Sequence, residues 1–150
     1  MTDTITIRPL APEDEAEWRR LWKAYLAFYG TTVSDEIYET TFARLLSEDH
    51  PRQNALMALL DGKAVGLVHY IYHPHNWRIE DVCYLQDLFA DPEARGKGVG
   101  RKLIEAVYRA ADAAGCPSVY WMTQDFNAEA RRLYDRIAQL TPFIKYQRQG

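Results

Sequence analysis

The feature that most constrains this chain is the segment RGKGVG at residues 95–100, which has three glycines and two cations in six residues. It follows the apolar run DVCYLQDLFA at 81–90, which is typical of a strand, and precedes RKLIEAVYRAADAA at 101–114, which has helical apolar spacing. A loop in this position points backbone N–H groups and the positive end of the helix dipole at one spot, and glycine lets the chain approach a ligand closely. The segment therefore predicts a strand–loop–helix unit that binds an anion, most simply a phosphate.

Two familiar phosphate-binding loops have a different spacing. A P-loop places Lys and then Ser or Thr after its last glycine, whereas Gly100 is followed here by Arg101 and Lys102. A dinucleotide-binding loop has the pattern G-x-G-x-x-G, whereas these glycines alternate, at positions 96, 98 and 100. Neither motif accounts for the segment. The plainer alternative to an anion site is a glycine-rich turn whose cations are solvated.

The rest of the chain has the periodicities of an α/β fold. Period-2 or continuous apolar runs predict strands at 4–8, 54–60, 64–72, 81–90, 118–122 and 143–147. Helical spacing predicts helices at 12–29, 35–46, 99–114 and 127–138. Asp61 and Gly62, between the second and third strands, are typical of a hairpin turn. This order predicts a mixed, mainly antiparallel central sheet flanked by helices, with the glycine loop leading from a strand into a helix.

Composition limits the classes of protein to which the chain can belong. With 150 residues and 47% hydrophobic content it is long enough for a core of its own, so residues 1–150 are assigned to a single domain. No apolar run approaches the roughly 20 residues of a membrane span, and the N-terminus lacks signal-peptide features. These observations favour a cytoplasmic protein without membrane contact. A net charge of −3 argues against a nucleic-acid partner.

No metal site is expected from the sequence. Cys83 and Cys116 have neither metal-site spacing nor a disulfide framework, so they are expected to be reduced thiols in apolar surroundings. His73 and His75 are close in sequence, but no third ligand stands at a useful spacing. The two histidines are therefore expected in a solvated loop.

Two segments together resemble the GNAT N-acetyltransferase superfamily. Its Q/R-x-x-G-x-G/A signature is matched at Arg95, Gly98 and Gly100. Its second signature is matched by NAEARRLY, in which Asn127 and Tyr134 hold the signature positions. The order of strands and helices agrees over essentially the whole chain. The resemblance implies a GNAT-like fold and an enzyme that transfers the acetyl group of acetyl-CoA to an amine.

The same resemblance implies where acetyl-CoA binds. The cosubstrate would lie in an opening between the strand at 81–90 and the strand at 118–122, with its pantetheine arm paired to the backbone of Leu88, Phe89 and Ala90. Asn127 is a further candidate contact, or an ordinary helix N-cap. The pyrophosphate would bind the glycine loop, whose residues are Arg95, Gly96, Lys97, Gly98, Val99, Gly100, Arg101 and Lys102.

The reaction requires proton transfer at two places. An alkylammonium must lose a proton before its nitrogen attacks the thioester, and the departing CoA thiolate benefits from a proton donor. The resemblance implies Tyr134 as the donor, although Tyr134 also falls in an apolar helical stripe that could be core. The candidates for the base are Asp87, Glu80, and a water chain ending at His73 or His75.

The segments HNWRIEDV and CYLQDLF further resemble the branch of polyamine, diamine and histone-like amine acetyltransferases. That branch usually has Glu at the position of Gln86, and an amide cannot accept a proton as a carboxylate does. In a regular strand Gln86 and Asp87 point to opposite faces unless a bulge intervenes. Both are nevertheless assigned to the acceptor site, together with Tyr29.

The expected acceptor is a primary amine on a cationic small molecule, such as a polyamine, a diamine or a lysine-like compound. The resemblance places the acidic segment with Asp35, Glu36 and Glu39 on the acceptor side, where carboxylates and the Tyr29 and Tyr38 rings could hold a second ammonium group. The alternatives are a protein lysine or N-terminus as acceptor, a non-catalytic acyl-CoA-binding module, and a domain for ordinary nucleotides. A homodimer is a further option, because family members often pair and the C-terminal half is rich in aromatic residues.

Overall fold

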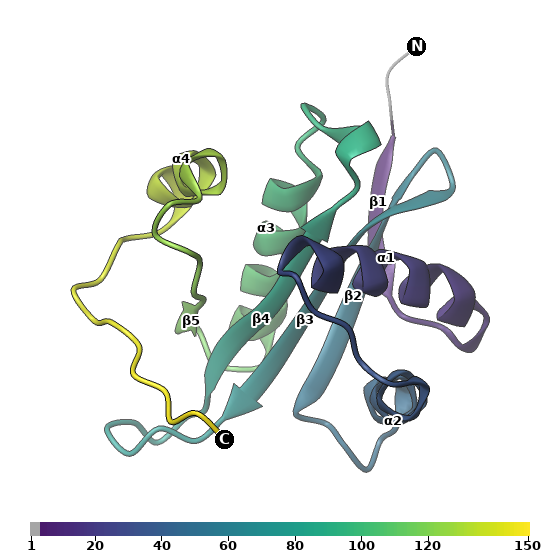
Figure 1. Cartoon of the computed structure of the whole chain (residues 1–150). Coiled ribbons are helices and arrows are strands. Elements are labelled where there is room, and N and C mark those ends of the chain that lie inside the picture. The colour runs from purple at the N-terminus through teal and green to yellow at the C-terminus, as the bar shows by residue number, and fades with distance from the viewer. Residues whose placement is uncertain (1–3) are drawn as a thin grey trace.

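A five-stranded sheet forms the centre of the molecule in a computed structural model that describes residues 4–150 (Figure 1). The strands follow the chain order across the sheet, and neighbouring strands are antiparallel except for the parallel pair at one edge, β4 and β5. This confirms the predicted mixed, mainly antiparallel sheet. The strands are β1 (Ile5–Pro9), β2 (Gln53–Leu60), β3 (Lys63–His73), β4 (Val82–Ala90) and β5 (Val119–Tyr120).

Helices cover both faces of this sheet. The two N-terminal helices, α1 (Glu15–Phe28) and α2 (Asp35–Leu46), pack on one face through a core that contains Trp18, Leu21 and Met57. The amphipathic helix α3 (Val99–Ala113) packs on the other face through Leu103 and Val107. The last helix, α4 (Ala128–Ile137), lies beyond β5 at the side of the sheet (Figure 1). The helices of residues 4–150 are all too short or too polar to span a membrane.

Helix α3 sits unusually close to β3 because Gly66 has no side chain. A Cβ at Gly66 would lie 2.7 Å from Cγ1 of Val99 and 3.1 Å from Cδ1 of Leu103, closer than carbon atoms pack. Val99 is the first residue of α3 and directly follows Gly98 of the glycine loop, so this contact sets the distance between the loop and the sheet.

A β-bulge interrupts the pairing of β3 with β4. His69 pairs with Asp87, but the next residue, Tyr70, pairs with Leu85, which leaves Gln86 as an extra residue in β4. A bulge changes the side-chain alternation of a strand. Gln86 and Asp87 therefore both contribute to the face that carries α1 and α2, where they line one cavity.

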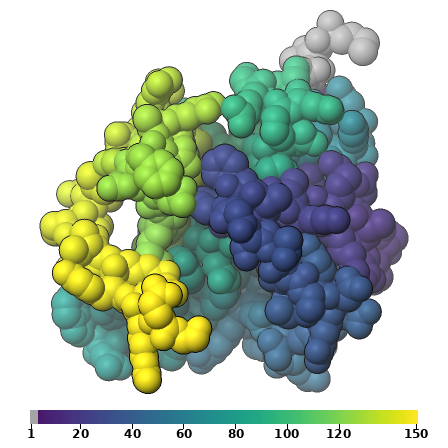
Figure 2. All heavy atoms as spheres, viewed as in Figure 1, coloured from purple at the N-terminus to yellow at the C-terminus, as the bar shows by residue number. Residues whose placement is uncertain are grey.

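Two predicted strands differ in the structure. The expected strand at 118–122 is reduced to Val119–Tyr120, which pairs with Cys83 and Tyr84 of β4. The expected strand at 143–147 is absent, since residues 138–150 contain neither helix nor strand and are exposed. A strand needs a neighbouring strand whose N–H and C=O groups pair with its own. The two-residue β5 offers very few such groups. The last residues instead run along the outside of the molecule (Figure 2).

Candidate active site

The glycine loop lies between β4 and α3, as the sequence predicts. Gly98 is the N-cap of α3 and has a φ of 77°, in the left-handed region that favours glycine. An added Cβ at Gly98 would meet no heavy atom within 4 Å, so the loop borders open space there. The first turn of α3 contains no acidic residue and no side chain caps it. A helix N-terminus of this kind favours an anion.

The cations of the loop are at the surface. Arg95 contacts Glu129 of α4 at 3.5 Å, and Arg101 contacts Glu105 at 3.8 Å within α3. Both pairs are largely exposed, so each stabilises the fold little and can be exchanged for a phosphate. Lys97 and Lys102 are exposed in the same region.

The end of β4 offers an open edge beside this loop. Within the described chain, β5 pairs with β4 at Cys83 and Tyr84, ahead of Leu88, Phe89 and Ala90. These three residues are half-buried, and their side chains alternate between the two cores: Leu88 packs on the α3 side and Phe89 on the α1 side. The backbone edge of β4 that faces away from β3 therefore has no strand partner at these three residues within the described chain.

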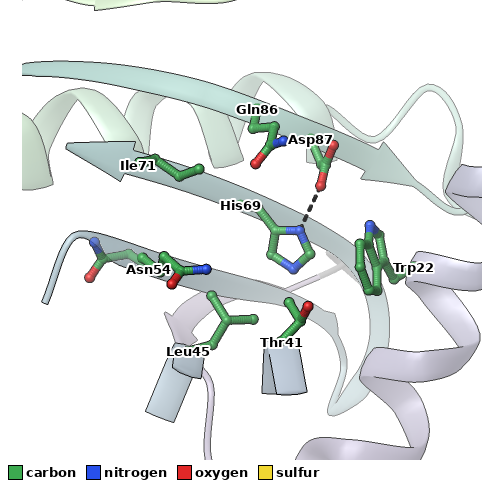
Figure 3. Close-up of a pocket in the computed structure, with 9 residues that line it drawn as sticks. Trp22, Thr41, Leu45, Asn54, His69, Ile71, Gln86 and Asp87 are labelled. Atoms are coloured by element: carbon green, nitrogen blue, oxygen red, sulfur yellow. Dashed lines mark hydrogen bonds and ion pairs between the residues drawn. The ribbon is translucent and has the colours of Figure 1, made fainter. Parts of the chain in front are cut away.

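Asp87 is held by buried partners on the α1 face of the sheet. Its Oδ2 atom lies 2.8 Å from Nδ1 of His69, and Nε2 of His69 accepts a hydrogen bond of 3.0 Å from the indole of Trp18 (the His69–Asp87 pair is drawn in Figure 3). His69 is 5% exposed and Trp18 is fully buried. Burial, followed by the charge of Asp87, raises the pKa of both Tyr25 and Tyr84. The Tyr25 and Tyr84 phenols near the Asp87 carboxylate therefore stay neutral.

A cavity of about 220 Å³ opens beside Asp87, between the sheet and the two N-terminal helices (Figure 3). Apart from Asp87 and His69, its polar lining consists of uncharged amides and one hydroxyl. The residues that line it are Trp22, Thr41, Leu45, Gln53, Asn54, His69, Ile71, Gln86 and Asp87. The cavity is large enough for a small polar molecule next to the carboxylate.

Tyr134 lies on α4 and is half-buried. Its ring packs on Trp121 with a centroid distance of 5.3 Å, and it also touches the core beneath α3. Burial, with a smaller contribution from Tyr29 of α1, raises the pKa of Tyr134 to about 12. The phenol therefore keeps its proton at neutral pH.

Several sequence candidates lie elsewhere. Asn127 caps α4, because its side chain accepts from the N–H of Ala130 at 3.4 Å. Glu80 pairs with Arg78 at 3.6 Å. His73 is the last residue of β3 and is not part of the solvated loop that was expected. With His75 it lines another cavity, of about 320 Å³, near the start of β4, where His73 Nε2 lies 2.8 Å from the Tyr120 hydroxyl. Among residues 4–150 no cluster of possible metal ligands was found.

The acidic residues of α2 do not line the cavity beside Asp87. Asp35, Glu36 and Glu39 are exposed, and Asp35 lies 4.0 Å from Arg19 of α1. The Arg19 guanidinium stands over the Tyr38 ring, at 5.3 Å from its centroid. An aromatic face that was expected to hold an acceptor cation is thus occupied by a cation of the chain itself.

Sequence reasoning missed His69 and Trp18. The available signal was a lone histidine inside the apolar run AVGLVHYIY, because a polar group buried in such a strand requires a hydrogen-bond partner. The indole N–H of Trp18, 51 residues away, supplies one.

Residues 18–138, which include the glycine loop, β4 and Tyr134, match the Acetyltransferase (GNAT) family. The chain belongs to this family. It is 41% identical to the D-amino-acid N-acetyltransferase HPA3 of Saccharomyces cerevisiae over 151 aligned residues, which cover 100% of this chain and 94% of that protein. It is 34% identical to the thialysine N-epsilon-acetyltransferase of Bos taurus over 73 residues, which cover 49% of this chain and 42% of that protein.

The fold agrees with solved acetyltransferase structures. The aminoglycoside N-acetyltransferase AAC(6')-Iy in complex with CoA superposes with a TM-score of 0.83 at 22% identity, covering 99% of this chain and 97% of that chain. The GNAT fold expected from the sequence is therefore confirmed, and the chain is an acetyl-CoA-dependent N-acetyltransferase.

Proposed function

We propose that this GNAT enzyme acetylates the primary amine of a free amino acid, with Asp87 as the proton acceptor. The observation that carries the proposal is the position of Asp87, a mostly buried carboxylate at the wall of a small cavity whose other polar lining is uncharged or already hydrogen-bonded. A cavity of this size and polarity suits a compact polar acceptor better than an extended polycation. The relative that aligns with the whole chain is named for D-amino acids, which supports the same class.

The proposed reaction needs no covalent enzyme intermediate. Asp87 accepts a proton from the acceptor ammonium, directly or through one water, and the neutral nitrogen attacks the thioester carbonyl of acetyl-CoA. The bond from the carbonyl carbon to sulfur breaks as the amide forms. Tyr134 donates its proton to the departing CoA thiolate, and the second proton of the nitrogen returns through solvent to the Tyr134 phenolate. The protonated Asp87 then releases its proton to solvent, which restores the starting state of the enzyme.

The proposed cosubstrate site uses the residues expected from the sequence. The open edge of β4 at Leu88, Phe89 and Ala90 would pair with the pantetheine arm. The loop from Arg95 to Lys102 would bind the pyrophosphate through its amides, with the exposed cations near the 3′-phosphate. Asn127 is proposed to shape the start of α4, since its side chain is already engaged as a cap.

A lysine-like compound or a diamine is the second candidate acceptor. The partial match to an enzyme named for the epsilon amine of thialysine favours this class. Such an acceptor would place its second charged group outside the cavity, toward Tyr29 and the acidic end of α2. Protein acceptors and a purely binding role are the remaining alternatives.

A panel of acceptors tests these proposals by release of the CoA thiol. We expect the highest kcat/KM for a D-amino acid, with lower values for lysine, thialysine, spermidine and a lysine-containing peptide. Preference for spermidine or for the peptide would replace the amino-acid proposal with the corresponding alternative. Acetyl-CoA at about 100 times its Kd should stabilise the fold by about 2.7 kcal/mol, and stabilisation without turnover of any amine would indicate a binding module.

The Asp87→Asn variant tests the base. It preserves the size of the side chain and removes its basicity, so kcat should fall by about 10²-fold or more for every acceptor that is used. Binding of acetyl-CoA should be retained. A kcat within about threefold of the wild-type value would exclude Asp87 as the base.

We also propose that two copies of the chain associate through the C-terminal segment, and that the enzyme acts in the cytoplasm. Leu140, Phe143, Ile144 and Tyr146 are all more than two-thirds exposed. Contiguous exposed apolar side chains of this kind are typical of an interface rather than of a free surface. The two-residue β5 is too short to pair with the C-terminal segment. The C-terminal segment of a second copy would supply a neighbouring strand instead.

A further inference from the structure

His69 is the buried polar residue that the reaction described above does not use. It lies on β3, at the register position opposite Asp87, and is enclosed by Trp18 and Trp22 of α1, with ring centroid distances of 6.0 Å and 5.3 Å. Both of its ring nitrogens have partners, Trp18 at Nε2 and Asp87 at Nδ1. Burying a polar ring costs free energy unless its nitrogens are hydrogen-bonded, and these two hydrogen bonds offset that cost. The effect of the two hydrogen bonds on Asp87 depends on the protonation state of the ring.

The partner at Nε2 decides the protonation state of the ring. An indole nitrogen is a hydrogen-bond donor only, so Nε2 must be the acceptor and carries no proton. The single ring proton is then on Nδ1 and is donated to the Asp87 carboxylate. An imidazolium would set two N–H groups against each other at 3.0 Å. Trp18 thus holds His69 as one neutral tautomer.

We propose that Trp18 and His69 form a neutral positioning relay, which orients the Asp87 carboxylate and prevents it from forming an ion pair with an imidazolium. A neutral donor fixes one carboxylate oxygen and leaves the negative charge uncompensated, so Asp87 remains an effective proton acceptor. A cationic His69 would stabilise the carboxylate and weaken it as a base. The inference rests on the proposed function of Asp87.

The other titratable groups around the pair add no charge to it. They are the phenols Tyr25 of α1, Tyr38 of α2 and Tyr84 of β4, and the raised pKa values of Tyr25 and Tyr84 keep both neutral under assay conditions. On the β2 side the cavity is lined by the uncharged Gln53 and Asn54. The protonation of His69 is therefore the event that can change the charge balance at Asp87.

The chain offers a matched pair of variants for the test. Trp18→Phe removes the N–H that blocks Nε2. Trp22→Phe makes the same change on the same helix, where the indole nitrogen is buried and has no hydrogen-bond partner among residues 4–150. Both variants lose a similar ring from the same core, so a pH-dependent effect that appears in Trp18→Phe alone reports on the relay rather than on packing.

We expect Trp18→Phe to lose activity selectively at low pH. At about pH 6 its kcat/KM should be a tenth of the wild-type value or less, because Nε2 can then accept a proton, and at about pH 9 it should recover to within about threefold. The ratio of Trp22→Phe to wild type should stay constant over the same range. His69→Asn, which keeps an N–H near the position of Nδ1, should retain at least about tenfold more activity than His69→Leu.

Heteronuclear NMR of the imidazole nitrogens tests the relay without any acceptor substrate. In the wild-type protein His69 should show the neutral Nδ1–H tautomer from about pH 6 to pH 9, and in Trp18→Phe it should titrate. A wild-type His69 that is protonated on Nε2, or a Trp18→Phe activity ratio that does not change with pH, would overturn the inference. Failure to acetylate any amine while the tautomer is confirmed would instead count against the proposed function.

Discussion

At the scale of single residues, the chemistry of this site depends on which groups are kept neutral. Burial raises the pKa of Tyr134 to about 12, so its hydroxyl, the proposed proton donor, is protonated at neutral pH. Asp87, the proposed proton acceptor, lines the cavity, and its partner His69 is hydrogen-bonded in turn by Trp18. The proposed proton acceptor and the proposed proton donor thus lie on different elements, β4 and α4, in different surroundings.

Replacing Tyr134 with Phe distinguishes a proton donor from a core residue. The ring and its packing on Trp121 are preserved, so Tm should change little, whereas kcat should fall by about 10²-fold because the leaving thiolate loses its proton source. Thermal unfolding and steady-state kinetics measure the two effects. An unchanged kcat would leave Tyr134 with a packing role alone.

The raised pKa of Tyr134 also predicts the basic side of the pH profile. The donor is active while protonated, and with its pKa raised to about 12 it is lost only as the pH approaches that value. The kcat of the wild-type enzyme should therefore show no decline between about pH 8 and pH 10. A decline in that range that disappears in Tyr134→Phe would show that the donor ionises earlier than its burial implies.

At the scale of elements, the unit from β4 through the glycine loop to α3 carries the proposed cosubstrate site. The strand presents an open backbone edge, and the helix presents its N-terminus to the same space. Gly98 provides the left-handed turn between them, and Gly66 lets α3 lie close to the sheet.

Valine at Gly98 should abolish binding of acetyl-CoA. The left-handed backbone costs about 1–2 kcal/mol with any L side chain, and the added methyl groups would project into the open space proposed for the pyrophosphate. Gly62→Val is the matched control, since Gly62 has a φ of 86° and also has nothing within 4 Å, but lies in the β2–β3 hairpin. Thermal shift with acetyl-CoA should be lost in the first variant and kept in the second. Loss of the shift in both variants would contradict the assignment of the loop.

Alanine at Gly66 tests the packing of α3. The new methyl group would overlap Val99, whose branched side chain has little freedom to move, so unfolding free energy should fall by about 1–3 kcal/mol. Because Val99 begins α3, affinity for acetyl-CoA should fall in the same variant. Denaturant titration and ligand titration measure the two changes. A stable Gly66→Ala with normal affinity would show that α3 moves freely against β3.

At the scale of the whole molecule, the chain leaves apolar surface at one side of the sheet. The two-residue β5 is the edge of the sheet, and residues 138–150 lie outside it without regular structure. Phe143 is 82% exposed and Tyr146 is 90% exposed, in a segment with strand-like alternation. Unpaired strand-like segments with exposed apolar residues readily pair with another chain.

Sedimentation equilibrium tests the proposed dimer. The wild-type chain should be dimeric, and the triple variant Phe143→Ser, Ile144→Ser and Tyr146→Ser should be monomeric because it removes the apolar side chains that an interface would bury. The control variant Lys145→Ser with Gln147→Ser changes polar neighbours in the same segment and should remain dimeric. A dimer with a Kd of about 10⁻⁶ M would be almost fully assembled at a protein concentration of about 10⁻⁴ M, which is about 100 times that Kd. A wild-type protein that is still monomeric at this concentration would contradict the proposal.

Local features of this chain were predictable because they depend on near neighbours in sequence. The glycines of the loop, the turn at Asp61 and Gly62 and the apolar spacing of α3 each depend on a backbone or periodicity requirement within a few residues. These features were sufficient for the order of the elements from β1 to α4 and for the position of the glycine loop between β4 and α3. They also placed Asp87 and Tyr134 on the correct strand and helix.

The acceptor side of the site was decided by contacts between distant segments. The bulge at Gln86 exists only in the pairing of β3 with β4, and it brings Gln86 and Asp87 to one cavity although alternation predicts opposite faces. The Trp18–His69–Asp87 chain joins α1, β3 and β4 across 51 and 18 residues of sequence. The segment 143–147 has strand-like alternation, but a strand also requires a neighbouring edge, and within residues 4–150 it has none. Sequence periodicity determines which conformation a segment favours, whereas pairing and burial in the folded chain determine which side chains meet.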